Sequence, residues 1–263
     1  MLRLDDPNVR QSKLGGKNFL TFKNDNGVSE VIRKSGSYAS SQADIKILEK
    51  NSFFVDVGSN IGAISFQLSN SVKNFSALAF EPIKYYYDLS IINLFNTKSV
   101  NIFNYAIGNC KKLSYAPVIN TEGVGNYGSV NLDFNTGRRL PVPMIRLDDF
   151  ILLREKRPGL IKIDVEGSEA EVLEGCSGLV NSKIIVSFEG DRRKSAMSAV
   201  QKALVLFQNV YACRFGGGGE LVSIMFFASN KRLDLSEFGM FEPITNPADY
   251  DQILSKFNIV PHP

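Results

Sequence analysis

The sequence has few residues that could form covalent or metal cross-links, since it contains three cysteines and one histidine in 263 residues. Cys110, Cys176 and Cys213 are odd in number and widely separated, so they match neither a disulfide framework nor a zinc-ligand spacing. Reduced thiols and a cytoplasmic location are therefore expected. The histidine, His262, stands in a Pro-His-Pro tail, which is an unfavourable place for a general base.

Long apolar runs and a large net charge are also missing. No stretch reaches the roughly 20 apolar residues of a membrane-spanning helix, and the most apolar run, Leu221 to Ala228, has the length of a strand. The first residues mix acids and bases where a secretory signal would be apolar. The net charge of +3, from 30 basic and 27 acidic residues, is too balanced for a broad nucleic-acid-binding surface. We expect a soluble protein with no membrane span and no indicated nucleic-acid partner.

Short apolar runs alternate with segments of helical periodicity, which is typical of βαβ units and a parallel sheet. Seven strands are predicted, at 53–57, 77–80, 100–105, 160–164, 184–188, 211–215 and 221–228. Four helices are predicted between them, at 62–69, 82–95, 168–175 and 195–207. The glycines at 216–219 suggest a reversal that makes the last strand antiparallel. The predicted fold class is α/β, with a seven-stranded, mostly parallel sheet and helices on both faces.

Hydrophobic residues make up 44% of the chain, enough to bury the core of one large domain with extensions. We predict an N-terminal extension at 1–45 with a hairpin around 24–27, a main domain at 46–230, and a C-terminal extension at 231–263. Residues 110–146 are predicted to be a long connection, and loops of that length are often lids or binding loops.

Two helix starts carry signals of their own. Ser168 and Glu171 have the spacing of a capping box, in which each side chain satisfies an amide at the helix start. Pro82 suits the first turn of a helix and favours an extended backbone at the residue before it.

The most informative motif is Phe53-Phe-Val-Asp-Val-Gly-Ser-Asn-Ile-Gly62, an apolar strand followed by a glycine turn and a helix. Gly58 permits a positive φ, and Gly62 lets the helix pack closely. The spacing is G-x-N-x-G rather than the G-x-G-x-x-G of dinucleotide sites, and Asp56 precedes it. A carboxylate here suits a cationic ligand without phosphate, such as S-adenosylmethionine. The alternative is a structural turn that Asp56 caps.

Polar residues also end the next two strands. Glu81 ends the second strand, where an acid can accept hydrogen bonds from both ribose hydroxyls of an adenosine ligand. It would equally suit a surface position before a helix. Asn104-Tyr-Ala106 ends the third strand, where an adenine contact and an ordinary strand end are alternatives.

A second acidic motif, Leu160-Ile-Lys-Ile-Asp-Val-Glu-Gly-Ser-Glu169, follows the same pattern of a strand that delivers acids to the carboxyl edge of a sheet. Ligands of open α/β sheets bind at that edge. Glu169 lies in the first turn of a helix, where the helix dipole already accounts for an acid. Asp164 and Glu166 are therefore the candidate functional acids. Glu189, at the end of the fifth strand, is either a third member of this set or a solvated strand end.

These segments resemble the FkbM family of methyltransferases over roughly residues 45–230. The motifs on which the resemblance rests are Phe-Val-Asp-Val-Gly-Ser-Asn-Ile-Gly, Phe80-Glu-Pro82, Arg146-Leu-Asp-Asp-Phe150 and Ile161-Lys-Ile-Asp-Val-Glu-Gly-Ser-Glu169. The resemblance implies a Rossmann-like class I methyltransferase fold, S-adenosylmethionine as methyl donor, and hydroxyl groups of sugars or secondary metabolites as acceptors.

The resemblance also implies individual residue roles. It places Asp164 at the methionine end of the cofactor, near the acceptor. It implies cofactor binding by Asp56, Gly58, Asn60, Gly62 and Glu81. Ser59, Pro82 and Ala106, which lie in the turn and at the strand ends described above, complete the predicted cofactor-binding set. Ser59 stands where family members often have alanine.

Methyl transfer is a direct displacement at a sulfonium carbon, so such an enzyme aligns donor and acceptor and excludes water. An alcohol acceptor must also lose its proton. Asp164, Glu166 and Glu189 are the candidate catalytic bases, acting directly or through a bound divalent ion such as Mg²⁺. The spacing of these residues does not decide whether a metal binds.

Two other functions stay open at this point. A nicotinamide-dependent oxidoreductase would explain the glycine turn and Glu81, but the glycine spacing and Asp56 argue against it. A catalytically silent adenosyl-binding or carbohydrate-interaction module would keep the turn and need no acids at the sheet edge. The expected partner is a small-molecule or glycan acceptor, and the oligomeric state is not predicted.

Overall fold

The computed structural model describes residues 6–38, 47–48, 53–97, 99–130, 132, 137–150, 152–153, 158–181, 183–190, 193–215, 223–235 and 240–259. The chain forms two compact units. The first unit comprises residues 1–52, 56–106 and 112–144, and the second comprises residues 53–55, 107–111 and 145–263. His262 and the glycines at 216–219 lie outside the described residues.

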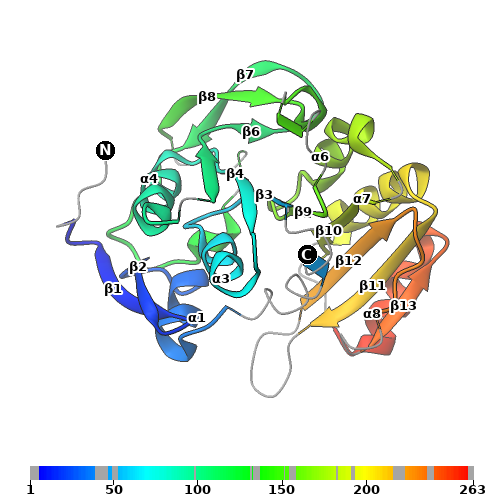
Figure 1. The fold of residues 1–263 in the computed structure, drawn as a ribbon, viewed down its shortest axis with the longest axis horizontal. Helices are drawn as coiled ribbons and strands as arrows, with labels where there is room; N and C mark the ends of the chain where they lie inside the picture. The colour runs from blue at the N-terminus through cyan, green and yellow to red at the C-terminus, as the bar shows by residue number, and fades with distance from the viewer. Residues whose placement is uncertain are drawn as a thin grey trace. The chain divides into compact units, whose positions relative to one another are not determined.

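The largest sheet has eight strands in the order β13-β11-β12-β10-β9-β3-β4-β5 (Figure 1). Its strands are β3 (Phe53–Val57), β4 (Ser76–Phe80), β5 (Val100–Phe103), β9 (Leu160–Ile163), β10 (Ile185–Glu189), β11 (Asn209–Phe215), β12 (Ser223–Ser229) and β13 (Phe241–Ile244). β4 pairs with β5 and β9 with β10 in parallel, whereas β12 runs antiparallel to both β10 and β11. The predicted parallel sheet with an antiparallel last strand is therefore confirmed.

The predicted count of seven strands is one too low for this sheet. The additional strand, β13, pairs antiparallel with β11 and lies at the edge of the sheet. It has four residues and includes Pro243, and a proline cannot donate to a sheet ladder. A short segment with a proline gives a weak strand signal in the sequence, which explains the omission.

The four predicted helices lie within two residues of their expected bounds. They are α3 (Ala63–Ser71), α4 (Lys84–Leu94), α6 (Glu169–Gly175) and α7 (Arg193–Leu206), and the structure adds α1 (Val28–Ser35) and α8 (Tyr250–Phe257). Short 3-10 helices occur at η1 (Tyr127–Ser129), η2 (Leu147–Asp149), η3 (Ser177–Leu179) and η5 (Pro247–Asp249). None of the helices in the described part of the chain is long and apolar enough to cross a membrane.

Both predicted helix starts need correction. The Ser168 side chain makes no capping hydrogen bond, and the Gly167 N–H instead donates to the Glu169 carboxylate at 2.9 Å. This local contact replaces the reciprocal bonds of a capping box. Pro82 lies before α4, which begins at Lys84, so the proline belongs to the connection and not to the first helical turn.

The N-terminal segment of the first unit is an antiparallel hairpin of β1 (Val9–Leu14) and β2 (Lys17–Phe22), followed by α1. Its turn is Gly15-Gly16, where both residues have positive φ, as a type I′ turn requires. The hairpin predicted around 24–27 is therefore wrong. Residues 24–27 instead lead into α1, because the Asp25 carboxylate accepts a hydrogen bond from the Ser29 N–H at 2.7 Å.

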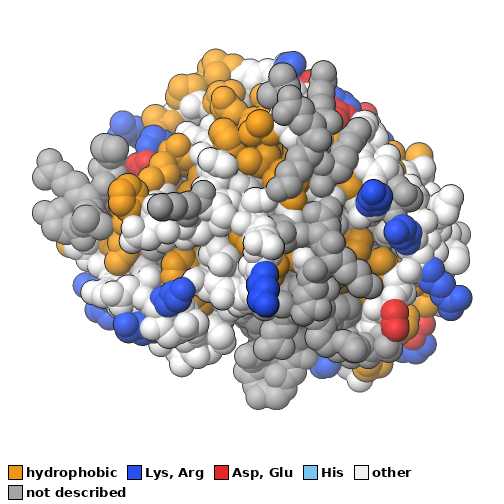
Figure 2. Space-filling view, in the orientation of Figure 1, with side chains coloured by type: hydrophobic (Ala, Val, Ile, Leu, Met, Phe, Trp, Pro, Cys, Tyr) orange, Lys and Arg blue, Asp and Glu red, His pale blue; other side chains and the backbone are white. Residues whose placement is uncertain are grey.

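The predicted long connection at 110–146 is wrong for much of its length, because strands of a separate three-stranded sheet occupy it. β6 (Ala106–Ile107), β8 (Arg139–Ile145) and β7 (Lys112–Pro117) form three strands in that order, with β7 and β8 antiparallel. Two prolines in β8 weaken its strand signal in the sequence. Figure 2 shows hydrophobic side chains gathered over β7 and β8, and the exposed ones include Leu113, Tyr115 and Leu140.

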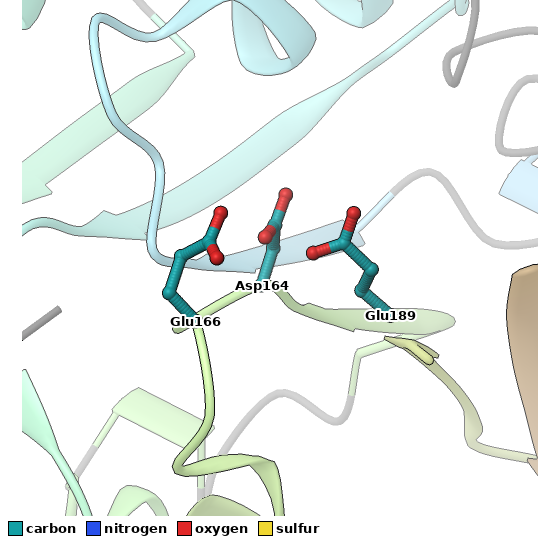
Figure 3. Close-up of side chains that lie close together, drawn as sticks. All are labelled: Asp164, Glu166 and Glu189. Atoms are coloured by element: carbon teal, nitrogen blue, oxygen red, sulfur yellow. The ribbon is translucent and has the colours of Figure 1, made fainter. Parts of the chain in front are cut away.

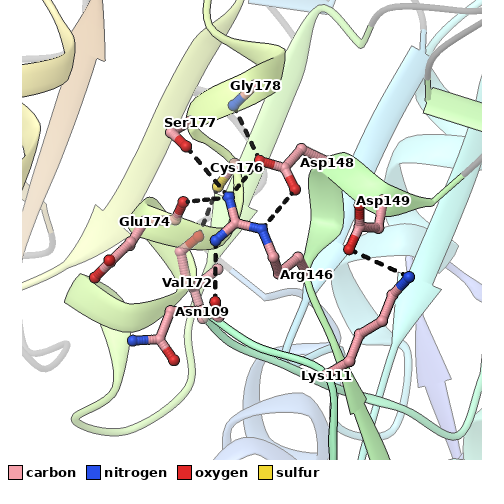
Figure 4. A network of polar contacts seen from close by, with 10 residues as sticks. All are labelled: Asn109, Lys111, Arg146, Asp148, Asp149, Val172, Glu174, Cys176, Ser177 and Gly178. Atoms are coloured by element: carbon pink, nitrogen blue, oxygen red, sulfur yellow. Dashed lines mark hydrogen bonds and ion pairs between the residues drawn. The ribbon is translucent and has the colours of Figure 1, made fainter.

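Arg146 joins three segments of the second unit (Figure 4). Its Nε and Nη2 donate to the two oxygens of Asp148 at 2.9 and 2.6 Å. Its Nη1 donates to the Asn109 carbonyl at 3.0 Å, and its Nη2 also reaches the Glu174 carbonyl at 3.1 Å. The end of α6 can approach the backbone at Gly108 because Gly175 has no side chain. A Cβ on Gly175 would lie 2.0 Å from the Gly108 carbonyl oxygen. The Arg-Leu-Asp-Asp motif thus has a structural role.

We expect Arg146→Lys to lower the free energy of unfolding by about 2 kcal/mol, because an ammonium cannot reproduce the bidentate contact with Asp148. Chemical denaturation would measure this, with the exposed Arg10→Lys as the matched control. An unfolding midpoint equal to that of the control would show that the network does not stabilise the unit.

Candidate cofactor-binding turn and carboxylate cluster

The turn between β3 and α3 has an unusual backbone. Gly58, Asn60 and Gly62 have φ values of 81°, 50° and 82°, all in the left-handed region. The predicted positive φ at Gly58 is therefore observed. Gly62 also has no space for a side chain, since an added Cβ would lie 2.7 Å from Leu94 Cδ1. Glycine at 62 is what lets α3 begin against α4.

Every backbone N–H from 58 to 62 already has an acceptor within the first unit. The acceptors are the Phe80 carbonyl for Gly58 and Ser59, Glu81 Oε2 for Asn60, Asn60 Oδ1 for Ile61, and the Ser59 carbonyl for Gly62, at 2.8–3.1 Å. Phosphate-binding turns instead direct unpaired backbone N–H groups at the ligand. The geometry of this turn does not suit a pyrophosphate.

Glu81 is fixed on both sides. The residue is 4% exposed, and its carboxylate oxygens accept hydrogen bonds from the N–H groups of Asn60 and Ile83, each at 2.8 Å. The Asn104 side-chain amide donates to the backbone carbonyls of Glu81 and Pro82, at 2.8 and 3.0 Å. The ends of β4 and β5 therefore hold Glu81 in one position next to the glycine turn.

The other predicted cofactor residues lie in the same unit. Asp56 is 1% exposed, and its Oδ2 accepts a hydrogen bond from the Ser65 hydroxyl at 2.7 Å. Ala106 is a buried residue of β6. Ser59 is 6% exposed, and its hydroxyl has no hydrogen-bond partner among the described residues. No sequence pattern indicates Ser65, because its contact with Asp56 depends on how α3 lies against β3.

The loop at 121–128 is anchored to the N-terminal segment of the first unit. Asp25 is 2% exposed, and its carboxylate accepts a hydrogen bond from the Tyr127 N–H at 3.0 Å. Gly125 exchanges two backbone hydrogen bonds with residues 24–26, at 3.0 and 3.1 Å. The loop is therefore held by its own unit along most of its length.

Three predicted acids come together in the second unit (Figure 3). One carboxylate oxygen each of Asp164, Glu166 and Glu189 lies within 4.8 Å of the others. Asp164 directly follows β9, and Glu189 is the last residue of the parallel neighbour β10, so the pairing of these strands aligns the two acids. Glu166 reaches the group from a turn in which its φ is 60°. We call these three residues the carboxylate cluster.

Lys162 is a further member of this site that the sequence reasoning missed. Its Nζ lies 2.8 Å from Asp164 Oδ2, and the two side chains are 4% and 29% exposed. A lysine in an otherwise apolar strand was the available signal. Glu169 lies nearby and is 2% exposed as a residue, and burial raises the pKa of its carboxyl. The Gly167 N–H holds Glu169 in a structural position, as the helix-start interpretation suggested.

The donor set of the cluster fits a hard divalent cation. Mg²⁺ and Ca²⁺ prefer carboxylate oxygens, and the three oxygens are close enough to surround one ion. The same set also fits a proton acceptor, because a carboxylate can accept the proton of an acceptor hydroxyl.

The order of the main sheet and its alternation with helices define a Rossmann-like α/β fold of the class I methyltransferase type. The chain matches the model of the methyltransferase FkbM domain over residues 56–212. It belongs to this family, and the resemblance seen in the sequence is confirmed.

Methyltransferase sdnD of Sordaria araneosa is 30% identical to this chain over a match that covers 50% of the chain and 63% of that protein. Among solved structures, a precorrin-6y C5,15-methyltransferase from Geobacter metallireducens is 15% identical, with a TM-score of 0.45, covering 71% of this chain and 85% of its own. An S-adenosylmethionine-dependent O-methyltransferase from Thermotoga maritima is 10% identical, with a TM-score of 0.44 and coverages of 86% and 79%.

Proposed function

We propose that this protein transfers a methyl group from S-adenosylmethionine to a hydroxyl oxygen of a small-molecule or glycan acceptor. Membership of the methyltransferase FkbM domain family supports the methyl transfer. The observation that carries the choice of cofactor is the turn at 58–62, whose backbone N–H groups are all engaged and whose neighbours are acids. Such a turn favours an adenosyl ligand with positive charge over a ligand with a pyrophosphate.

The proposed cofactor contacts follow from chemistry. A carboxylate such as Glu81 is a strong acceptor for two ribose hydroxyls, and its two backbone contacts orient it for that role. Asp56 contributes negative charge that favours the ammonium and the sulfonium. The proposed binding set is Asp56, Gly58, Ser59, Asn60, Gly62, Glu81, Pro82 and Ala106.

For the transfer step, the cofactor supplies a methyl group activated by a sulfonium. The protein has to align the acceptor, exclude water and remove the hydroxyl proton. We assign proton removal to the carboxylate cluster, with Asp164 as the base and Glu166 and Glu189 beside it. A divalent cation held by the same three side chains would instead favour ionisation of the alcohol through its charge.

The acceptor class rests on the family resemblance, which points to hydroxyl groups of sugars or secondary metabolites. A cluster of carboxylates is consistent with this class, since an alcohol needs a base or a cation before it can attack a methyl group. The anchored loop at 121–128 is the proposed contributor to acceptor selection, because binding residues often lie on loops held by a rigid scaffold.

Calorimetry with S-adenosylhomocysteine and NAD in parallel tests the cofactor assignment. We expect measurable binding of S-adenosylhomocysteine and none of NAD, because no backbone N–H of the turn is available to a pyrophosphate. Preferential binding of NAD would support an oxidoreductase. A hydroxyl-acceptor panel, with product detected as released S-adenosylhomocysteine, then tests catalysis. Repeating it after chelation separates a metal from a carboxylate base, and binding without turnover on any acceptor would favour a catalytically silent module.

A further inference from the structure

The outer face of the β7 and β8 pair is apolar, although it is exposed to solvent (Figure 2). Leu113 lies opposite Pro143 in the antiparallel register. Two positions further along, Tyr115 lies opposite Pro141, so these four residues share one face. All four are exposed, Leu113 to 61% and Tyr115 to 49%. The solvated face of an antiparallel sheet is normally polar, and a contiguous apolar face marks a contact surface.

The opposite face of the same two strands is already packed. Ala116 and Val142 occupy the alternate positions, are 2% and 1% exposed, and belong to the hydrophobic core. The strands are therefore oriented correctly on the core, and a slip of register does not explain the apolar residues on the outer face.

Basic residues lie at both ends of this outer face. Lys112 begins β7 and Arg139 begins β8, and both are exposed. Because the strands are antiparallel, the two residues lie at opposite ends of the pair. Arg139 Nη2 donates to the Tyr115 carbonyl at 2.6 Å, and this neutral acceptor leaves the positive charge of the guanidinium in place. Neither strand contains an acid. The face is thus apolar in its middle and positive at its ends.

We propose that this outer face binds the surface of an anionic lipid membrane. Apolar and aromatic side chains enter the boundary between headgroups and acyl chains, and the projecting Leu113 and Tyr115 suit that layer. Lysine and arginine remain among the anionic headgroups, which matches Lys112 and Arg139. The proposal concerns attachment to a membrane surface and is independent of the proposed methyl transfer.

A second copy of this chain fits the face less well. A two-fold contact between identical faces brings each positive end against a positive end of the other copy, whichever way the two faces are turned. A stable dimer also needs about 20–30 residues a side, far more than this face supplies. An acidic polypeptide would match the charge, but Leu113 and Tyr115 project into solvent instead of lining a groove that could hold a peptide.

Cosedimentation with vesicles tests the proposal. We expect the protein to bind vesicles of phosphatidylcholine mixed with phosphatidylglycerol, to bind them less as salt is raised, and not to bind phosphatidylcholine alone. The double variant Leu113→Ser, Tyr115→Ser should weaken binding about tenfold or more, because two inserted apolar side chains are lost. Lys112→Glu should weaken it about tenfold, because the charge next to the anionic surface changes by two.

Two matched variants control for general effects of hydrophobicity and charge. Phe95→Ser removes an apolar side chain that is 80% exposed and lies outside this sheet. Lys23→Glu makes the same change of charge at another exposed lysine of the first unit. Both should bind the mixed vesicles as the wild type does. All of these variants should keep the wild-type melting temperature, because the replaced side chains are exposed.

The other occupants give different results. Absence of binding to the mixed vesicles, or equal binding to both kinds of vesicle, overturns the proposal. Equal weakening by the control variants also overturns it, since the attraction would then not be specific to this face. A dimer seen by analytical ultracentrifugation and abolished by Leu113→Ser, Tyr115→Ser would assign the face to a second copy. Binding of poly-glutamate that requires Leu113 and Tyr115, without vesicle binding, would assign it to an acidic polypeptide.

Discussion

Asp164→Asn is expected to reduce turnover by about 100-fold or more, because the variant keeps the shape of the side chain and removes the proposed base. The structure adds a second effect. The Lys162 ammonium, on a side chain 4% exposed, would lose its charged partner. We expect the free energy of unfolding to fall by up to about 3 kcal/mol, less than for a fully buried pair, because the Asp164 side chain is 29% exposed. Steady-state rates and thermal unfolding on one preparation measure the two effects.

The double variant Lys162→Met, Asp164→Asn separates catalysis from stability. Methionine has a similar length and no charge, so the double variant removes the buried ammonium together with the charge of Asp164 and should recover most of the lost stability. Its turnover should stay as low as that of Asp164→Asn. Recovery of turnover together with stability would show that Asp164 stabilises the fold and is not the base. The single variant Lys162→Met measures what the ion pair contributes to turnover and to the free energy of unfolding.

Glu81→Ala is expected to weaken S-adenosylhomocysteine binding by about 100-fold or more. The variant removes the acceptor proposed for two ribose hydroxyls, and each such charge-assisted bond contributes about 1.5–3 kcal/mol. It also leaves the N–H groups of Asn60 and Ile83 without the carboxylate that now accepts from them. Calorimetry on protein whose folding is verified by circular dichroism measures the effect.

Glu81→Gln is the more conservative companion. It keeps the size of the side chain but turns one acceptor into an amide that faces a backbone N–H, so it should weaken binding by an intermediate amount. Glu122→Ala, in an exposed loop position, is the control and should bind normally. Normal affinity in a folded Glu81→Ala would remove Glu81 from the proposed cofactor contacts.

The strands and helices of the main sheet were predictable because their signals are local. β3 was predictable because four of its five residues are apolar, and Gly58 and Gly62 mark the turn that follows it. β7, β8 and β13 were missed because their residues are partly exposed or include proline, so their pairing depends on partners distant in the sequence. The Gly15-Gly16 hairpin was misplaced because the polar run at 24–27 gave the stronger turn signal.

The carboxylate cluster was predictable for a related reason. Asp164 and Glu189 each follow an apolar run, and parallel strands that pair in register bring their ends together. The contacts that modify these acids were not predictable. The Lys162 ion pair depends on side-chain direction within a strand, and the contact of Glu81 with the Asn60 N–H depends on a turn 21 residues away in sequence.

The anchor between the N-terminal segment and the 121–128 loop also governs how this protein can change by recombination. Asp25 and Tyr127 contact each other although they are 102 positions apart. A Cβ on Gly27 would lie 2.1 Å from Asn126 Oδ1. Replacing Gly27 by a residue with a side chain would therefore require a compensating change at Asn126. The two segments therefore have to be exchanged together. A chimera that borrows the loop from a relative must borrow that relative's counterpart of residues 24–29 as well.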